Sequence, residues 1–230
     1  MPDIRFLTQT RSGETERVIA IDNLVIAGWT GRDSARMEEH IAELEALGIK
    51  RPRTTPMFYR AAAARLTTAD TIQTTGDKSS GEAEVLLVND DGQHWVGLAS
   101  DHTDREVEAY GITVSKQMCD KPCARILWPL DEVIGHWDQL RLSSAIVENG
   151  DRVTYQQGTL DAMLGLEDLI GRYEKETGSF PSGTAMLCGT LPAIGGVRGA
   201  PVFEMSLEDP VLGRRIDHGY RIEVLPIAEA

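Results

Sequence analysis

The 230 residues of this chain suffice for one large or two small domains, and a composition of 41% hydrophobic and 26% charged residues is typical of a folded globular protein. Its 23 Lys and Arg stand against 36 Asp and Glu, and the net charge of −13 repels phosphate backbones and anionic lipid. The sequence also shows neither an apolar stretch long enough to span a membrane nor a secretory leader. We therefore expect one domain over residues 1–230, in the cytoplasm, with neither nucleic acid nor membrane as its partner.

The clearest predicted helix runs from about Ser34 to Leu47, where apolar residues recur at helical spacing. Asp33 or Ser34 can cap its start, and Gly48 can end it. At about 100° per residue, His40 lies at the flank of the apolar stripe and Glu43 one step further round the same face. This helix therefore presents a histidine and a carboxylate together.

Short segments rich in β-branched and apolar residues alternate with turn signals along the rest of the chain. They predict a sheet-dominated protein with few helices, a β-rich α+β fold. A second helix is expected around residues 160–176, where apolar residues repeat less regularly. The predicted strands cover residues 18–21, 24–27, 83–88, 94–99, 112–114, 185–188 and 220–225.

Three acidic residues are brought together by one predicted hairpin. Glu82 and Glu84 are two residues apart at the start of a strand, so their side chains leave the same face with Cα atoms about 7 Å apart. Asp91 and Gly92 form a two-residue turn to the next strand. Counting back along the paired strands from that turn, Glu82 lies opposite Asp101, and directly opposed residues share a face.

Such a cluster of like charges is destabilising unless something neutralises it. Carboxylate oxygens are the ligands that Mg²⁺, or Mn²⁺ in its place, binds while it keeps some of its water. The sequence therefore predicts a divalent metal site at Glu82, Glu84 and Asp101. The alternative is a solvated acidic face at the end of a strand, which charged residues commonly form.

The order of these and other short motifs resembles the fumarylacetoacetate hydrolase superfamily, and most of all a divergent branch described as DUF2848. The resemblance implies a mixed β-sandwich roll with a few short helices. It extends from about residue 24 to 196. The matching segments are Gly28-Trp-Thr-Gly-Arg-Asp33, His40-Ile-Ala-Glu43, Pro56-Met-Phe-Tyr-Arg60, Ser100-Asp-His-Thr-Asp-Arg-Glu-Val-Glu108, Val114-Ser-Lys116, Asn149-Gly150 with Gln157-Gly-Thr159 and Met163, and Cys188-Gly-Thr-Leu-Pro192 with Gly195.

The resemblance assigns Glu82, Glu84 and Asp101 to the metal and implies a catalytic dyad of His40 and Glu43. In such a dyad the carboxylate orients the imidazole, which takes a proton from water so that hydroxide attacks a ketone carbon. The alternative for this pair is a structural helix whose histidine is half-buried and whose glutamate is solvated. The two interpretations differ in whether substitutions act on turnover or on stability.

The resemblance also implies that Lys116, in a segment that we expect to be extended, donates to a developing enolate or to a substrate carboxylate. An ordinary surface lysine is the alternative. In a protein of net charge −13 an anionic substrate needs local cations, which arginines supply through bidentate contacts. The residues expected to bind substrate are Arg32, Arg60, Arg105, Gln157, Gly189 and Thr190.

The implied activity is metal-dependent hydrolysis of a C–C bond in a small β-dicarbonyl or acylpyruvate-like acid, and the implied assembly is a homodimer. The same site chemistry suits decarboxylation, isomerisation or hydration of a related keto acid. A metal-binding module without turnover is a third reading, because Arg60 and Glu108 stand where the family has Lys and Gln. Hydrolysis is the leading interpretation, and the retained His40 and Glu43 speak against a module without turnover.

Overall fold

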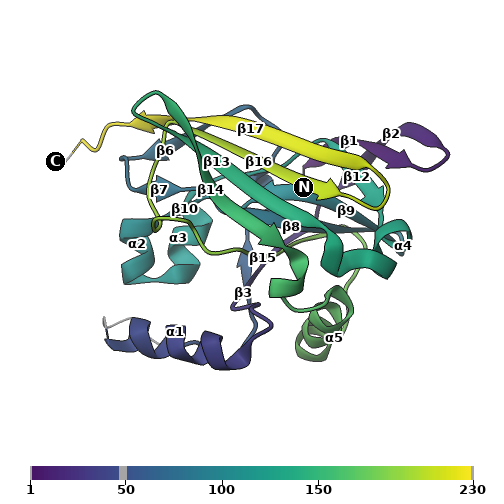
Figure 1. Ribbon diagram of the computed structural model, residues 1–230, viewed down its shortest axis with the longest axis horizontal. Helices are drawn as coiled ribbons and strands as arrows, with labels where there is room; N and C mark the ends of the chain where they lie inside the picture. Colours follow the sequence, from purple (N-terminus) through teal and green to yellow (C-terminus); the bar gives the residue numbers. More distant parts are fainter. Residues whose placement is uncertain (1, 47–50, 229–230) are drawn as a thin grey trace.

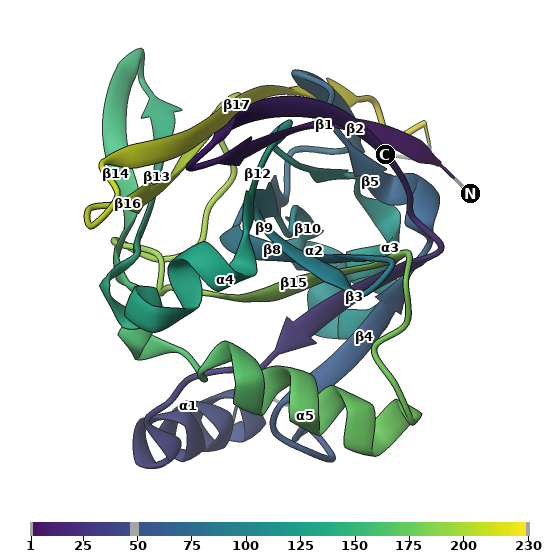
Figure 2. The same ribbon diagram turned by 90° about the vertical axis from the view of Figure 1, so that its right-hand side faces the viewer.

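A computed structural model of the chain describes residues 2–46 and 51–228 (Figure 1). Two β-sheets form its main layers, and short helices lie around them. Figure 2 shows the strands of the smaller sheet above strands β8, β9 and β15 of the larger one. The predicted β-rich α+β fold with few helices is therefore confirmed.

The larger sheet has eight strands in the order β2-β1-β12-β9-β8-β15-β3-β4, with parallel and antiparallel pairs. The central strand β8 is buried on both faces, which explains why its sequence is almost continuously apolar. The strands are β1 (Asp3–Thr10), β2 (Gly13–Ala20), β3 (Asn23–Gly28), β4 (Met57–Ala61), β8 (Ala83–Asp90), β9 (Gln93–Ser100), β12 (Ile126–Pro129) and β15 (Thr184–Thr190).

The smaller sheet has five strands in the order β14-β13-β16-β17-β6, and two short two-stranded sheets pair β10 with β7 and β11 with β5. The five strands are β6 (Thr71–Thr75), β13 (Arg141–Glu148), β14 (Asp151–Thr159), β16 (Val202–Asp209) and β17 (Arg214–Leu225). The short ones are β5 (Leu66–Thr67), β7 (Ser79–Ser80), β10 (Thr103–Asp104) and β11 (Lys121–Pro122).

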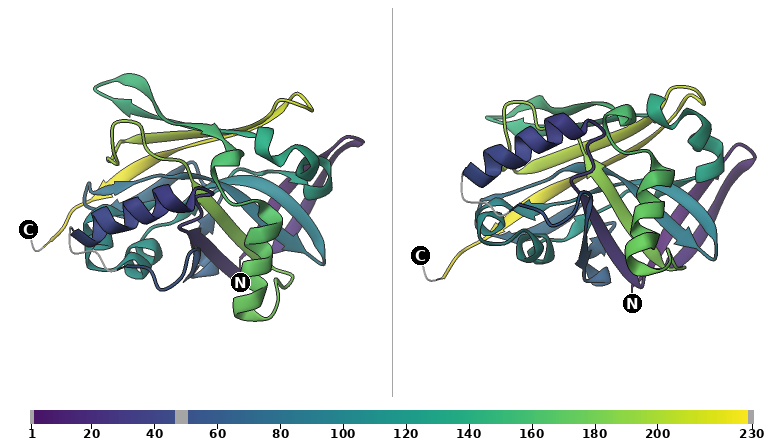
Figure 3. Two further views of the ribbon diagram at one scale, coloured as in Figure 1. Left: turned by 60° about the horizontal axis from the view of Figure 1, so that its bottom comes forward. Right: turned by 90° about the horizontal axis from the view of Figure 1, so that it is seen from below.

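Among the described residues, five α-helices surround the sheets: α1 (Ser34–Ala46), α2 (Arg105–Tyr110), α3 (Ile112–Met118), α4 (Leu130–Val133) and α5 (Leu166–Thr177), with 3₁₀ turns at Ala63–Arg65, Ile134–Gln139 and Leu160–Ala162. In Figure 2, α1 and α5 lie at the bottom of the molecule and β17 lies at the top. Figure 3 shows the same two helices from below. Within the described ranges, no helix is long and apolar enough to cross a membrane.

Two apolar cores lie on opposite faces of the larger sheet, because alternate residues of each strand point to opposite sides. On β8, Val85 and Leu87 enter the core shared with the smaller sheet. Leu86 and Val88 enter the second core, which β1, β3, β4 and β12 also line. The carboxylates at the start of β8 therefore lie at the end of a strand that packing fixes on both faces.

The predicted strands agree with β2, β3, β8, β9, β15 and β17, but the strand predicted over 112–114 is wrong. Those residues belong to α3, which starts where the Gly111 carbonyl accepts the amides of Val114 and Ser115. The β-branched residues of this segment favour a strand, and tertiary context overrides that preference.

The first predicted helix is confirmed as α1. The carboxylate of Asp33 accepts hydrogen bonds from the amides of Ala35 and Arg36, as an N-cap does, while Leu47 and Gly48 lie outside the described residues. The second predicted helix, over 160–176, is broken. A 3₁₀ turn precedes Met163, which bridges to Gly31, and α5 begins only after that contact.

Candidate metal centre and active-site cavity

The three predicted metal-ligating carboxylates meet at the open end of the β8–β9 hairpin. The register pairs Ala83 with Ser100, and one step further the Asp101 amide donates to the Glu82 carbonyl over 2.9 Å. Carboxylate oxygens of Glu82, Glu84 and Asp101 lie within 4.8 Å of one another. The predicted hairpin register is therefore confirmed, and it brings the three side chains together.

Glu84 and Asp101 are buried, while Glu82 is partly exposed. The backbone amide of Gly189 donates to a Glu84 oxygen over 2.7 Å. Burial, with the negative charge of Asp101 as a second cause, raises the pKa of Glu84 well above its ordinary value. A cation bound in place of the proton would therefore stabilise the ionised form of Glu84.

Two lysines contact Asp101 from different elements. Lys116 of α3 forms an ion pair with one oxygen, and Nζ of Lys121, on β11, lies 3.3 Å from the other. Burial alone would raise the pKa of Asp101, but the two ammonium groups outweigh it and lower the pKa to about 2. Burial lowers the pKa of Lys116 less than Asp101 and Glu82 raise it, so Lys116 stays protonated.

Lys121 is fully buried and was missed in the sequence. Its ammonium group donates to the carbonyl of His102 over 2.6 Å and to that of Cys119 over 3.2 Å. Burial lowers its pKa. A single Lys before a proline carries no motif, so nothing in the sequence separates it from a surface lysine.

Arg105 lies at the start of α2 and holds the third cluster carboxylate. Its guanidinium group lies 3.3 Å from Glu82 and 2.9 Å from Glu108, and its Nε donates to Ser80 over 2.7 Å. Its polar contacts are thus with the protein's own side chains, two of them acidic. The expectation that Arg105 binds substrate directly stays a prediction, and its observed partners give it a role in positioning Glu82.

The cluster opens on a cavity of about 1120 Å³ between the end of β3, helix α1, the α2–α3 pair and the segment after β15. Gly189 and Thr190 line it, as does Arg32. Gly189 has a φ of +101°, and a Cβ there would lie 1.8 Å from the Thr30 hydroxyl, so only glycine fits. Arg32 binds both carboxylate oxygens of Asp138, over 2.7 and 2.6 Å.

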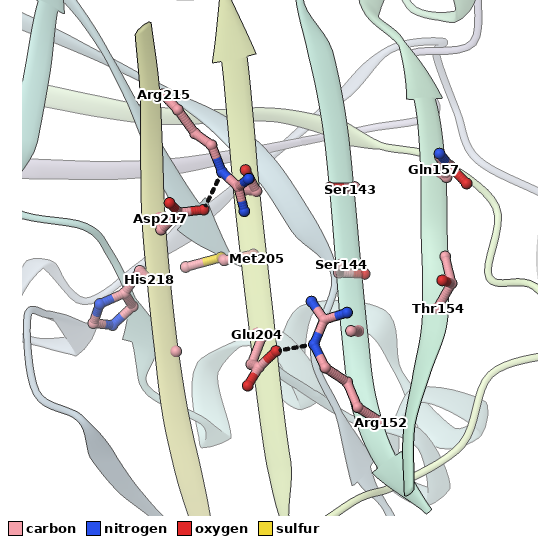
Figure 4. Close-up of a pocket in the computed structure, with 13 residues that line it drawn as sticks. Ser143, Ser144, Arg152, Thr154, Gln157, Glu204, Met205, Arg215, Asp217 and His218 are labelled. Atoms are coloured by element: carbon pink, nitrogen blue, oxygen red, sulfur yellow. Dashed lines mark hydrogen bonds and ion pairs between the residues drawn. The ribbon is translucent and has the colours of Figure 1, made fainter.

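Two of the predicted substrate-binding residues lie elsewhere. Arg60 is exposed and donates to the side chain of Asn23 over 2.6 Å, outside the cavity lining. Gln157 lies on the smaller sheet, at a second hollow of about 570 Å³ that also includes the Arg152–Glu204 ion pair (Figure 4). Neither is therefore brought to the carboxylate cluster.

The neighbouring Gln156 points inward instead. It accepts from the amide of Ala83 over 2.9 Å and donates to Thr190 over 2.7 Å and to the Leu191 carbonyl over 2.6 Å. It thus joins the start of β8 to the segment that follows β15. A β-bulge in the β13–β14 pair, where two neighbouring residues of β14 are both buried, places Gln156 inside and Gln157 outside.

His40 and Glu43 belong to α1, but their side chains lie outside what the structure describes. The helix borders the cavity through Arg36 and Met37. The predicted dyad therefore stays a prediction.

The donor set of the cluster fits a hard divalent cation. Three carboxylates supply oxygen ligands, Glu82 keeps one side open to the cavity, and thiol or imidazole ligands are not among the grouped residues. His102, next to Asp101 in sequence, is bonded instead to Tyr220 over 3.0 Å and Ser79 over 2.9 Å. Glu82, Glu84 and Asp101 would hold the ion.

Solved structures of other proteins share the fold of this chain. A candidate fumarylpyruvate hydrolase from Burkholderia cenocepacia superposes with a TM-score of 0.62 at 18% identity, covering 99% of this chain and 97% of its own. A 2-keto-3-deoxy-D-arabinonate dehydratase, complexed with magnesium and 2,5-dioxopentanoate, gives 0.66 at 16% identity, covering 92% of this chain and 77% of its own. A yeast fumarylacetoacetate hydrolase family protein gives 0.61 at 17% identity, covering 89% and 94%.

No curated protein sequence matches the chain. Residues 27–220, however, match the model of DUF2848, a family of proteins of unknown function. The match spans most of the chain, including the carboxylate cluster and nearly all of the cavity lining. The chain therefore belongs to the DUF2848 family, and its fold is that of the fumarylacetoacetate hydrolase proteins.

Proposed function

We propose that this protein is a metal-dependent hydrolase that cleaves a C–C bond of an acylpyruvate-like acid, with Mg²⁺ or Mn²⁺ held by Glu82, Glu84 and Asp101. The observation that carries the proposal is the cluster of three carboxylates within 4.8 Å, beside a buried lysine and open to a large cavity. A bound divalent cation would polarise a keto oxygen of the substrate. The structural neighbour with magnesium and a keto acid supports this choice of cofactor and substrate class.

Lys116 supplies a fixed positive charge at the same place. It is buried, its pKa is raised, and Asp101 directs its ammonium group toward the cluster. Breaking the C–C bond leaves negative charge on the pyruvate half of the substrate. A protonated lysine that is already oriented stabilises that charge without reorganisation.

His40 and Glu43 would complete the reaction from α1. His40 takes a proton from water, and the hydroxide oxygen attacks the acyl carbonyl carbon. The C–C bond then breaks, its electron pair goes to the pyruvate methylene carbon, and that carbon takes up a proton. The balance is one acylpyruvate and one water to one carboxylic acid and one pyruvate.

Turnover of acetylpyruvate, followed by loss of enol absorbance, tests the proposal. We expect activity with Mg²⁺ or Mn²⁺, its loss after chelation, and its loss in Glu84→Gln, while Glu176→Gln at an exposed position of α5 serves as the matched control. Calorimetry should show weaker metal binding by Glu84→Gln alone. Equal metal binding by both variants would refute the metal site.

Product analysis separates hydrolysis from the other reactions on a keto acid. Hydrolysis gives pyruvate and acetate, whereas decarboxylation releases CO₂, and isomerisation or hydration leaves the carbon chain intact. His40→Ala should abolish hydrolysis and leave metal affinity unchanged, because His40 is not among the proposed ligands. A hydrolytic rate that survives His40→Ala would refute its role as the base.

A further inference from the structure

The cavity beside the carboxylate cluster is larger than a small keto acid needs. Its volume of about 1120 Å³ exceeds the roughly 300–1,000 Å³ typical of sites for drug-sized ligands. Glu82 and Glu84 line it, and the keto-acid group of a substrate would bind beside them. Much of the remaining wall is apolar and includes Trp29, Met37, Tyr59, Ile112, Met163 and Leu191.

The apolar wall begins directly beside the proposed catalytic lysine. The ring of Tyr59 lies 5.7 Å from Nζ of Lys116, and its hydroxyl accepts a hydrogen bond from the indole of Trp29 over 3.3 Å. Gly28 lies against the Tyr59 ring, because a Cβ there would approach it to 2.9 Å. The aromatic pair is therefore held in place by β3 and β4.

The backbone of Trp29 is in the left-handed region, with a φ of 62°. This conformation is uncommon for a bulky residue and is strained, so the surrounding structure has to offset its cost. Residues held in this way cluster at ligand sites. The strain at Trp29 is consistent with a functional position for its indole in the cavity wall.

The charges around the cavity do not favour a second anionic group on the substrate. Six of the described lining residues are acidic: Asp33, Glu39, Glu82, Glu84, Glu108 and Asp161. Four are cationic, namely Arg32, Arg36, Arg105 and Lys116, and Arg36 is the one among them without an ion pair to a described residue. A divalent cation and Lys116 can receive one carboxylate, and a second would face a surplus of negative charge.

We propose, on the basis of the function proposed above, that the preferred substrates carry one carboxylate and an uncharged, apolar acyl group, aryl or alkyl, which packs against Trp29 and Tyr59. The aromatic wall then determines which acyl groups bind, while the reaction takes place at the carboxylate cluster. Burial of apolar surface is worth about 0.8 kcal/mol per methylene, or about fourfold in affinity. The acyl group is therefore the part of the substrate that the cavity selects.

A substrate panel tests this proposal. We expect kcat/KM for benzoylpyruvate to exceed that for acetylpyruvate by at least about tenfold. Fumarylpyruvate, whose acyl group carries a second carboxylate, should fall below benzoylpyruvate by a similar factor. Trp29→Ala should lower the ratio of benzoylpyruvate to acetylpyruvate kcat/KM about tenfold, whereas Tyr110→Ala, at an exposed position of α2, should leave it unchanged.

A binding measurement keeps the proposal separate from the proposed function. We expect N-phenyloxamate to bind the wild-type protein at least about tenfold more tightly than oxamate by calorimetry, with the difference lost in Trp29→Ala. If no keto acid is cleaved but this difference is present, the hydrolase function fails and the apolar site stands. If acetylpyruvate is cleaved but the two oxamates bind alike, the apolar site fails and the hydrolase function stands.

The Arg36→Gln variant, assayed with fumarylpyruvate, gives the result that would contradict the proposal most directly. If fumarylpyruvate is the best substrate and Arg36→Gln removes that preference, Arg36 binds a second carboxylate. The proposal is then wrong.

Discussion

Protonation of His102 is expected to limit the stability of this protein in acid. The ring is buried, and both nitrogens are engaged by hydroxyl groups, those of Tyr220 at 3.0 Å and Ser79 at 2.9 Å. Burial, together with the positive charge of Lys121, lowers the pKa of His102 to about 3. The folded protein therefore holds the neutral imidazole down to a pH at which an unfolded chain is protonated.

The sign and size of the effect follow from this lowered pKa. Because the folded pKa lies below the ordinary value of 6.5, the contribution of His102 to stability is complete above pH 6.5 and is lost as the pH falls toward 3. Each pH unit in that window costs about 1.4 kcal/mol. Between pH 7 and pH 5 the metal-free protein should therefore lose about 2 kcal/mol of unfolding free energy through this one residue.

Urea denaturation of wild type and His102→Gln at pH 7 and pH 5, both metal-free, measures this contribution. His102→Gln lacks the titrating group, so the gap between the two proteins should shrink by about 2 kcal/mol at pH 5. Glu84 titrates with the opposite sign, because its pKa is raised, but it is present in both proteins and cancels. A gap that stays constant between the two pH values would refute the reasoning.

Three further variants test the architecture of the site. Lys121→Met should lower the unfolding free energy by about 3 kcal/mol and strengthen Mg²⁺ binding, because it removes a buried cation beside Asp101, and denaturation with calorimetry checks both effects. Gln156→Leu leaves several buried hydrogen-bonding groups unpaired and should cost at least about 2 kcal/mol in urea denaturation, whereas Gln157→Leu should cost under about 0.5. Gly189→Ala should lower both the melting temperature and metal affinity, since the new methyl would overlap the threonine hydroxyl described above; an unchanged variant would contradict the close approach.

The carboxylate cluster could be predicted because its geometry is local. Asp91 and Gly92 have φ values of 51° and 86°, which a tight hairpin turn requires, and that turn alone fixes which residues pair along β8 and β9. A reading of turn type and strand alternation therefore placed Glu82 against Asp101 correctly. Long-range information was not needed for this part of the site.

The inward glutamine could not be predicted, because it depends on an irregularity. Strict alternation along β14 does not place both Tyr155 and Gln156 on the buried side, yet both are buried at the bulge. Bulges carry no reliable sequence signature of their own. The family motif pointed to Gln157, one residue away from the side chain that makes the buried contacts.

The helical state of Lys116 and the contribution of Lys121 depend on tertiary contacts. The β-branched residues before Lys116 suggest a strand, but this segment forms helix α3. Gly111 precedes the first residue of that helix, which packs near β4 and β10. Lys121 forms its ion pair with Asp101 from β11, a strand that pairs with the distant strand β5. In both cases the relevant partner is distant in sequence or on another element.

The β8–β9 hairpin carries all three proposed metal ligands within twenty consecutive residues, while the apolar wall comes from β3, β4 and the segments around residues 112, 163 and 191. The proposed metal ligands and most of the proposed specificity wall thus lie in separate stretches of the chain, whereas Lys116 shares helix α3 with the wall residue Ile112. Related proteins can change their substrate range by substitutions in the wall segments, without altering the hairpin that carries the proposed metal ligands. Protein engineers can follow the same division, by randomising the wall while keeping residues 82–101 fixed together with His40, Glu43 and Lys116.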